Sequence, residues 1–238
     1  MANSIDSYIL DYAAGRASFM LGEVFDSYAK DQPIERSVMT WHLAKLTAKG
    51  LLARIGKGVY AKSEKAVFSP VLSAEAKEIV KSIKELFPVA KLCVYEGPWI
   101  SPLLHHLASN QIIYIEVEKL AAESVFEQMK MDGRSVYFRP DEDMIYRYIN
   151  LDDRAIFVKN LISESPTTKN DGIPVATLEK LLVDIYKDPD FYYLQGGEYR
   201  SIMSNARMLY SINTDRLFRY ASRRSVKEEI MGIYNEAE

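Results

Sequence analysis

Cysteine and histidine are scarce in this chain, which has one cysteine and three histidines among 238 residues. A single cysteine excludes an internal disulfide and any thiolate-rich zinc site. Cys93 stands in the apolar run LCVY, so we predict a buried small hydrophobic residue and not a nucleophile. His105 and His106 are adjacent, and on a helix they would point about 100° apart, which does not suit a shared metal. The sequence therefore predicts neither a disulfide scaffold nor a histidine-based metal centre.

Long apolar runs are also missing, since none approaches the roughly 20 residues that a membrane-spanning helix needs. The first fifteen residues, MANSIDSYILDYAAG, contain Asp6 and Asp11 and lack a basic stretch ahead of an apolar run, so no secretion signal is predicted. Hydrophobic residues make up 48% of the chain and charged residues 26%, which is ordinary for a globular protein. We expect a cytoplasmic protein without membrane association.

An overall excess of positive charge is absent, because 30 basic and 33 acidic residues give a net charge of −3. This balance argues against a general polyanion binder. Residues 30–62 differ from the rest: they hold seven Lys or Arg and two Asp or Glu, a net charge of +5, whereas the remaining 23 basic and 31 acidic residues sum to −8. A basic segment within an acidic chain is the charge pattern expected of a module that binds a nucleic acid duplex.

The basic segment also has the pattern of a winged helix-turn-helix. Met39, Leu43 and Leu46 recur at the spacing of a helix that buries one face, and Gly50 is typical of a helix end. Residues 51–55 and 59–62 then predict two strands around the turn Gly56-Lys57-Gly58. Apolar stripes over 5–12 and 21–28 predict two helices packing beneath. We therefore predict a winged-helix DNA-binding domain over residues 1–65.

The candidate DNA-facing residues share a basic or hydrogen-bonding side chain on the predicted helix or hairpin: Arg36, Ser37, Thr40, Trp41 and Lys45 on the helix, and Arg54 and Lys57 on the hairpin. Two alternatives stay open. Winged helices also serve as packing or protein-interaction modules without nucleic acid. Trp41 could equally pack its ring against the hairpin instead of a sugar.

Residues 66–238 predict a second domain of mixed α/β type that ends in a helical bundle, which makes the whole chain α+β. A helix is expected over 73–87, and strand-like runs at 91–97, 111–119, 134–140 and 154–160 alternate with helical patterns at 99–109, 119–131 and 141–149. Residues 165–174 are polar and predict a loop. Four helices are expected near 175–185, 199–209, 214–221 and 226–233. The last two carry five cations, which are either a solvated face or a surface for an acidic partner: Arg216, Arg219, Arg223, Arg224 and Lys227.

The stretch RSVMTWHLAKLTAKGLLARIGKGVYA resembles the winged-helix half of AbiEi-like antitoxins, the transcriptional repressors of bacterial type IV toxin–antitoxin pairs that act in abortive infection. The segments LISESP, VATLEKLLVDIYKD, YLQGGEYRSI and YSINTDRLFRYASRRSVKEE are similar to AbiEi-related bacterial regulators. The resemblance implies an antitoxin that represses its own promoter, with a nucleotidyltransferase-type toxin as possible partner. It assigns no toxin-contact residue. Because one small winged domain offers a limited interface, we expect a homodimer on double-stranded DNA.

The resemblance further implies a degenerate nucleotidyltransferase fold in the C-terminal half. That reaction needs a Gly-Ser turn and two carboxylates, one residue apart, that hold magnesium. Gly97-Pro98-Trp99 lacks the serine. Glu116 and Glu118 share a strand face and are weak metal-ligand candidates, although an exposed strand face is the simpler interpretation. We therefore predict no enzyme activity and no cofactor; the alternative is a metal-dependent nucleotidyltransferase whose winged helix guides nucleic acid.

Overall fold

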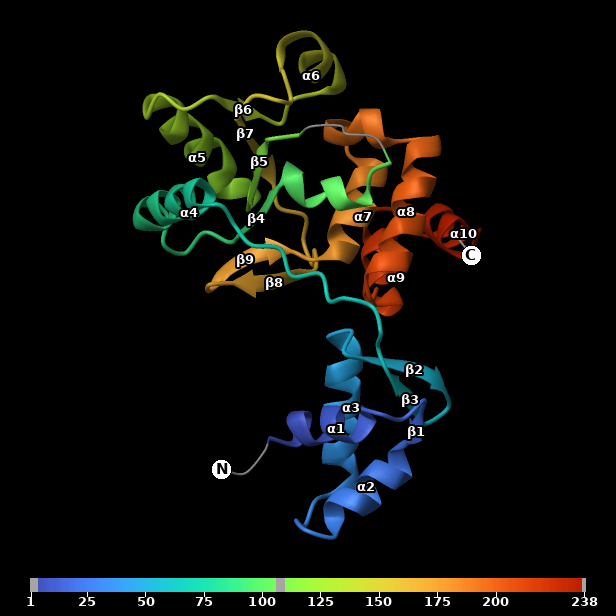
Figure 1. Ribbon diagram of the computed structural model, residues 1–238. Coiled ribbons are helices and arrows are strands. Elements are labelled where there is room, and N and C mark those ends of the chain that lie inside the picture. Colours follow the sequence, from blue (N-terminus) through green and yellow to red (C-terminus); the bar gives the residue numbers. More distant parts are fainter. Residues whose placement is uncertain (1–3, 106–109, 237–238) are drawn as a thin grey trace. The chain divides into compact units, whose positions relative to one another are not determined.

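The computed structural model describes residues 4–105 and 110–236, and the fold is α+β, as predicted. The chain divides into two compact units (Figure 1). The first contains the residues up to Phe68 together with Arg207–Asn213. The second contains Ser69–Ala206 and the residues from Thr214 onward. Each unit has its own hydrophobic core.

The N-terminal unit consists of three helices and a small antiparallel sheet. Its elements are α1 (Ile5–Ala13), β1 (Phe19–Met20), α2 (Leu21–Ala29), α3 (Arg36–Ala48), β2 (Leu52–Gly56) and β3 (Val59–Lys62). The strand order is β1-β3-β2. The three helices and the hairpin predicted from the sequence are confirmed. Strand β1 was not predicted, because two residues are too short to show an alternating pattern.

The stripe on α3 forms the centre of this unit's core. Met39, Leu43 and Leu46 are buried against α1, α2 and the sheet. Helix α3 ends before Gly50, which has φ +72°, a left-handed conformation that favours glycine. The apolar spacing therefore predicted the position of α3, and Gly50 predicted its C-terminal end.

The segment Arg207–Asn213, which comes late in the chain, belongs to the N-terminal unit. The amide of Ala66 donates to the carbonyl of Leu209 (3.2 Å), and the amide of Ser211 donates to the carbonyl of Ala66 (2.9 Å). A Cβ atom on Gly50 would lie 2.7 Å from the Cβ of Ser211, so glycine is required there for packing as well as for its φ angle. The predicted N-terminal domain, residues 1–65, does not include Arg207–Asn213, because no local sequence pattern shows that this segment packs there.

The C-terminal unit is built on a mixed six-stranded sheet with the order β6-β7-β5-β4-β9-β8. The strands are β4 (Leu92–Glu96), β5 (Ile113–Val117), β6 (Val136–Phe138), β7 (Ile156–Asn160), β8 (Thr167–Asn170) and β9 (Ile173–Ala176). Strands β4 to β7 confirm the four predicted runs. The loop predicted at 165–174 is wrong, because these residues form the β8–β9 hairpin. Asp171 and Gly172 both have positive φ at its turn, so the dipeptide Asp-Gly was the signal for this hairpin.

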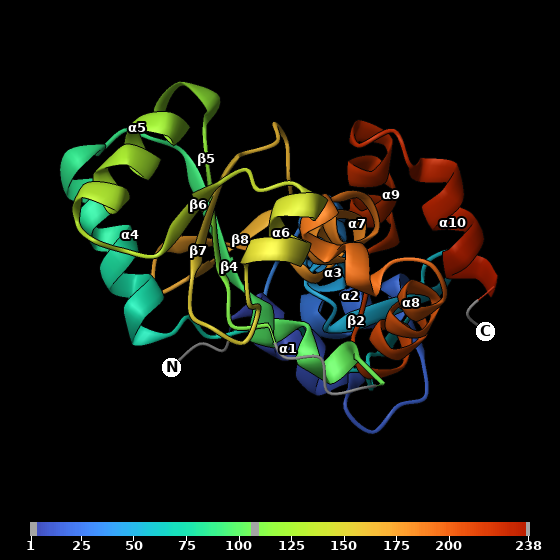
Figure 2. The same cartoon turned by 90° about the horizontal axis from the view of Figure 1, so that it is seen from above.

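The two faces of this sheet differ in chemistry. One face is aliphatic and packs against α4 (Ala74–Leu86) and α5 (Lys119–Met131). The other lies beneath α7 (Leu178–Lys187) and carries aromatic, charged and thiol side chains on alternate positions of the central strands: Cys93, Tyr95, Tyr114, Glu116, Phe157 and Lys159. Figure 2 shows α4 and α5 on one side of the strands and the C-terminal helices on the other.

Helices α8 (Gly197–Leu209), α9 (Thr214–Arg223) and α10 (Lys227–Glu236) follow α7 and the short 3₁₀ helix η3 (Pro189–Leu194), which confirms the predicted helical tail. Helix α6 (Glu142–Tyr148) lies between β6 and β7 in the sequence. The helix predicted at 99–109 is replaced in its first part by two 3₁₀ turns, Gly97–Trp99 and Ser101–Leu103, each with a proline near its start. His106 lies outside the described residues.

Candidate nucleic-acid interface and buried ionic cluster

The face of α3 opposite its buried stripe is exposed and includes Ser37, Thr40 and Trp41. Trp41 is 59% exposed, so its ring is not packed into the core. The hydroxyl of Thr40 donates to the carbonyl of Arg36 (2.8 Å), and that of Ser37 donates to the carboxylate of Glu35 (3.2 Å). These local bonds leave the acceptor capacity of both hydroxyls open to a ligand.

Arg36 and Lys45 border this exposed face on opposite sides. They are nine residues apart, which at about 100° per residue places them half a turn away from each other. The guanidinium of Arg36 lies 5.8 Å from the ring centroid of Phe25. The ammonium of Lys45 lies 5.1 Å from the ring of Trp41. The two cations therefore flank the face and do not form one cluster on it.

Asp6 on α1 holds one edge of the exposed face in place. Its carboxylate accepts from Lys45 Nζ and contacts His42 Nδ1, both at 2.6 Å. Partial burial opposes ionisation, but the contacts with Lys45 and His42 prevail and lower the pKa of Asp6. Part of the positive charge of Lys45 is therefore already compensated. Asp6 was not predicted as a residue of this face, since no local pattern links it to His42, 36 residues away.

The β2–β3 hairpin carries the remaining candidate cations, Arg54 and Lys57, and both are exposed. The Nε group of Arg54 donates to the carbonyl of Gly56 (3.3 Å), which directs its side chain along the hairpin. The register shifts between Arg54 and Gly56, and Gly58 has φ +72° at the tip. Lys57 thus stands at the end of a tight, irregular turn with its ammonium free to reach an anion.

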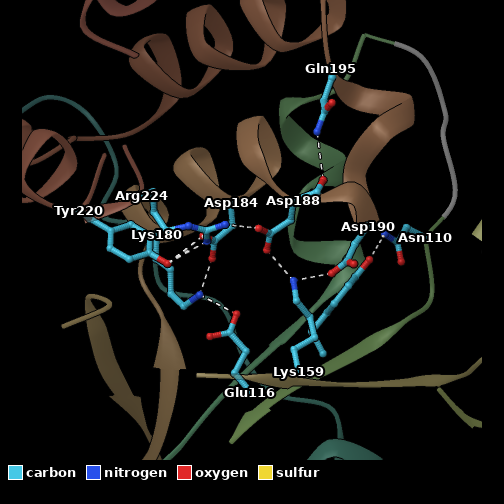
Figure 3. A network of polar contacts seen from close by, with 11 residues as sticks. Asn110, Glu116, Lys159, Lys180, Asp184, Asp188, Asp190, Gln195, Tyr220 and Arg224 are labelled. Atoms are coloured by element: carbon cyan, nitrogen blue, oxygen red, sulfur yellow. Dashed lines mark hydrogen bonds and ion pairs between the residues drawn. The ribbon is translucent and has the colours of Figure 1, made fainter. Parts of the chain in front are cut away.

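A second site lies inside the C-terminal unit, where ion pairs join seven charged side chains over the polar face of the sheet (Figure 3). Lys180 of α7 is fully buried, and its ammonium contacts Glu116 of β5 at 2.7 Å and also Asp184 one turn along α7. Asp184 accepts a further bond from Tyr220 (2.8 Å) and pairs with Arg224 (2.6 Å). Residues from β5, α7, α9 and the turn after α9 are thereby joined.

The same cluster continues toward η3. Arg224 also pairs with Asp188, and the ammonium of Lys159 lies 2.6 Å from Asp188 and contacts Asp190 as well. The cluster therefore contains four carboxylates and three cations. The Oδ2 atom of Asp190 accepts no well-directed hydrogen bond despite its ion pair with Lys159, and the Oε2 atom of Glu116 accepts none either.

Burial and charge act in opposite directions on these groups. Burial raises the pKa of Asp184 to about 6, with Lys180 and Arg224 opposing it. Asp188 is also buried, but Lys159 and Arg224 lower its pKa to about 2. Burial raises the pKa of Asp190. Since one carboxylate is in excess over the cations, a proton held near Asp184 or Asp190 would make the cluster neutral.

Glu116 and Glu118, the weak metal candidates, engage different partners. Glu116 is only 2% exposed, so its interpretation as part of an exposed strand face is wrong: β4, β7 and α7 enclose it. Glu118 follows the end of β5 and accepts from the backbone amide of Lys91 (3.0 Å). Within residues 4–105 and 110–236, no group of three or more His, Cys, Asp or Glu side chains is placed to hold a metal ion. Gly97, which lacks the serine of a nucleotidyltransferase Gly-Ser turn, approaches Asn110 so closely that an added Cβ would lie 2.1 Å from the Asn110 side chain.

Comparison with known proteins defines the class to which this chain belongs. The chain is a member of the family of unknown function DUF6577, whose match covers residues 38–238 and so extends from within α3 to the C-terminal helix. No curated protein matches the chain. None of the helices in the described part of the chain has the length and apolar character needed to cross a bilayer.

Proposed function

We propose that the N-terminal unit is a winged helix that binds double-stranded DNA, and that the protein is a transcriptional regulator. The observation that carries the proposal is the arrangement of α3 and the β2–β3 hairpin. The helix uses Met39, Leu43 and Leu46 for packing and leaves its opposite face exposed, while the adjoining hairpin exposes two cations. A helix that binds in the major groove needs one face packed against its own domain and the opposite face free to contact bases.

The element order of the unit supports the same proposal. A helix, a short strand, two further helices and a hairpin, with the first strand pairing to the last, is the topology of winged helix-turn-helix domains. Within it, Ser37, Thr40 and Trp41 on the exposed face are the proposed base-contacting side chains. Arg36 and Lys45 on the flanks, and Arg54 and Lys57 on the hairpin, are the proposed phosphate contacts.

The biological role proposed for this DNA binding follows from the AbiEi-like resemblance. The protein would repress its own promoter as the antitoxin of a toxin–antitoxin pair, in the cytoplasm, with a nucleotidyltransferase-type toxin encoded beside it. Two copies on one operator would supply the affinity that a single small domain lacks. The C-terminal unit would then provide pairing or partner contacts.

The direct test is selection of bound sequences from a random duplex library by the full-length protein, followed by affinity measurements over a range of salt concentrations. We expect an enriched motif and a linear fall of log affinity with log salt. Lys57→Ala should weaken binding to every duplex and reduce the slope by about one. Thr40→Ala or Trp41→Ala should instead change which sequence is preferred, because base contacts carry the specificity.

The matched control is Lys81→Ala, an exposed lysine on α4 of the C-terminal unit. It changes the net charge by the same amount as Lys57→Ala but lies outside the proposed interface, so its salt slope should equal that of the unchanged protein. Equal losses in the two variants would show that only net charge matters. Failure to bind any duplex at low salt would refute the DNA-binding role altogether.

A further inference from the structure

The cation run at the C-terminal end of the chain separates into two sets in the folded protein. Arg216 pairs with Glu179, and Arg224 belongs to the buried cluster. Arg219, Arg223 and Lys227 are exposed. Positions 216, 220 and 224 follow the inner side of α9 and its last turn, whereas 219 and 223 follow its outer side. Lys227 begins α10 after the break at Ser225, so a single run of basic sequence supplies both an internal and an external surface.

The three outer cations surround an open groove in the surface of the C-terminal unit. Its lining comes from α9, from α10 and from the residue Glu164 that precedes β8: Glu164, Asp215, Phe218, Arg219, Ser222, Arg223, Lys227 and Met231. Phe218 and Met231 are half-buried and give the groove an apolar part. Cations beside an apolar surface match a ligand that is itself both acidic and apolar.

We propose that this groove, called here the α9–α10 groove, is a docking site for an acidic amphipathic protein segment. Carboxylates of the segment would pair with Arg219, Arg223 and Lys227, and one of its apolar side chains would contact Phe218 and Met231. The Arg223 guanidinium donates to the hydroxyl of Ser163, a neutral partner that does not cancel its charge. In the described part of the chain no ion pair engages Arg219 or Lys227.

The composition of the groove favours such a segment over nucleic acid. Asp215 and Glu164 stand among its three cations, so its formal charge is only slightly positive. A duplex carries about one negative charge per 1.7 Å of its length and would bring phosphates against these carboxylates. A peptide can place its acidic residues selectively beside the three cations, and its apolar side chains suit Phe218 and Met231.

The test uses the full-length protein and a fluorescein-labelled peptide that alternates Glu with Leu. We expect binding at physiological salt, and a drop of roughly fivefold in affinity for the double variant Arg219→Gln/Arg223→Gln, which corresponds to about 1 kcal/mol for the two exposed ion pairs together. The control Lys81→Gln removes an exposed lysine of α4 and should leave binding unchanged. Hydrogen exchange should slow in α9 and α10 when the peptide is added.

Several outcomes would overturn the proposal. A matching peptide with Gln in place of Glu should bind more weakly. Equal affinity of the two peptides would show that the cations of the groove do not pair with peptide carboxylates. Stronger binding of a duplex or a single-stranded oligonucleotide through the same arginines would assign the groove to nucleic acid. If the peptide slowed hydrogen exchange only in elements other than α9 and α10, or bound Arg219→Gln/Arg223→Gln as tightly as the unchanged protein, its binding site would lie elsewhere. This test is independent of DNA binding by α3.

Discussion

Replacement of Lys180 by methionine tests whether the buried cluster is a charged network that holds the C-terminal unit together. Methionine has nearly the length of lysine and suits a buried position, so the change removes the ammonium with little change in packing. Glu116 and Asp184 would then lose the cation that both contact. Removal of one partner from a buried ion pair costs about 3–5 kcal/mol, because the remaining charge stays out of water.

The expected loss depends on pH. Without Lys180 the pKa of Asp184, already raised to about 6 by burial, should rise further. Asp184 would keep its pair with Arg224, but without Lys180 it can take up a proton more readily as the pH falls, which relieves the penalty by at most about 1.4 kcal/mol per pH unit. The destabilisation should therefore be smaller at pH 5 than at pH 7.

Urea unfolding of the C-terminal unit would measure this loss. In a Trp41→Phe background, Trp99 is the remaining tryptophan and reports on the C-terminal unit, where it packs against the aliphatic core. The control Lys77→Met breaks a surface pair with Asp171 in the same unit and should cost no more than about 1 kcal/mol. A loss for Lys180→Met that is no larger than for the control, or that is independent of pH, would refute the charged-network interpretation.

Three further outcomes follow from the structure. In the unchanged protein, the free energy of unfolding should gain a contribution from Asp184 as the pH falls from about 6 toward 3.8, because the folded state binds the Asp184 proton more tightly than the unfolded state does. This contribution should appear in the urea midpoints of the unchanged protein between these pH values and be missing from those of Asp184→Asn, and the same pH dependence in both proteins would contradict it. Gly97→Ala should destabilise the C-terminal unit by several kcal/mol, since an added Cβ would overlap Asn110, and a thermal shift within a degree of the parent would contradict the close approach. Gly172→Ala should cost about 1 kcal/mol from its φ of +81° alone, and a neutral result would contradict the tight hairpin turn.

Local patterns in the sequence identified most of the secondary structure. The stripe of Met39, Leu43 and Leu46 predicted α3, and Gly50 its end, because burial of one helical face and a left-handed cap are local requirements. The strands β4, β5 and β7 were also predictable, since their apolar runs are continuous. The β8–β9 hairpin was missed because its polar edge strand lacks that signal, although Asp171-Gly172 marked its turn.

The sequence by itself determined the basic segment over residues 30–62, the α+β class and the choice of candidate residues for the proposed DNA interface, because charge counts and periodicity depend only on residue order. Only the tertiary structure decided how those charges are used. It pairs Lys45 with Asp6 and buries Glu116 beneath Lys180, and it sends Arg224 inward while Arg223 faces outward. Ion pairs of this kind join residues that are far apart in the chain, so their partners become known only when the strands and helices are placed in space.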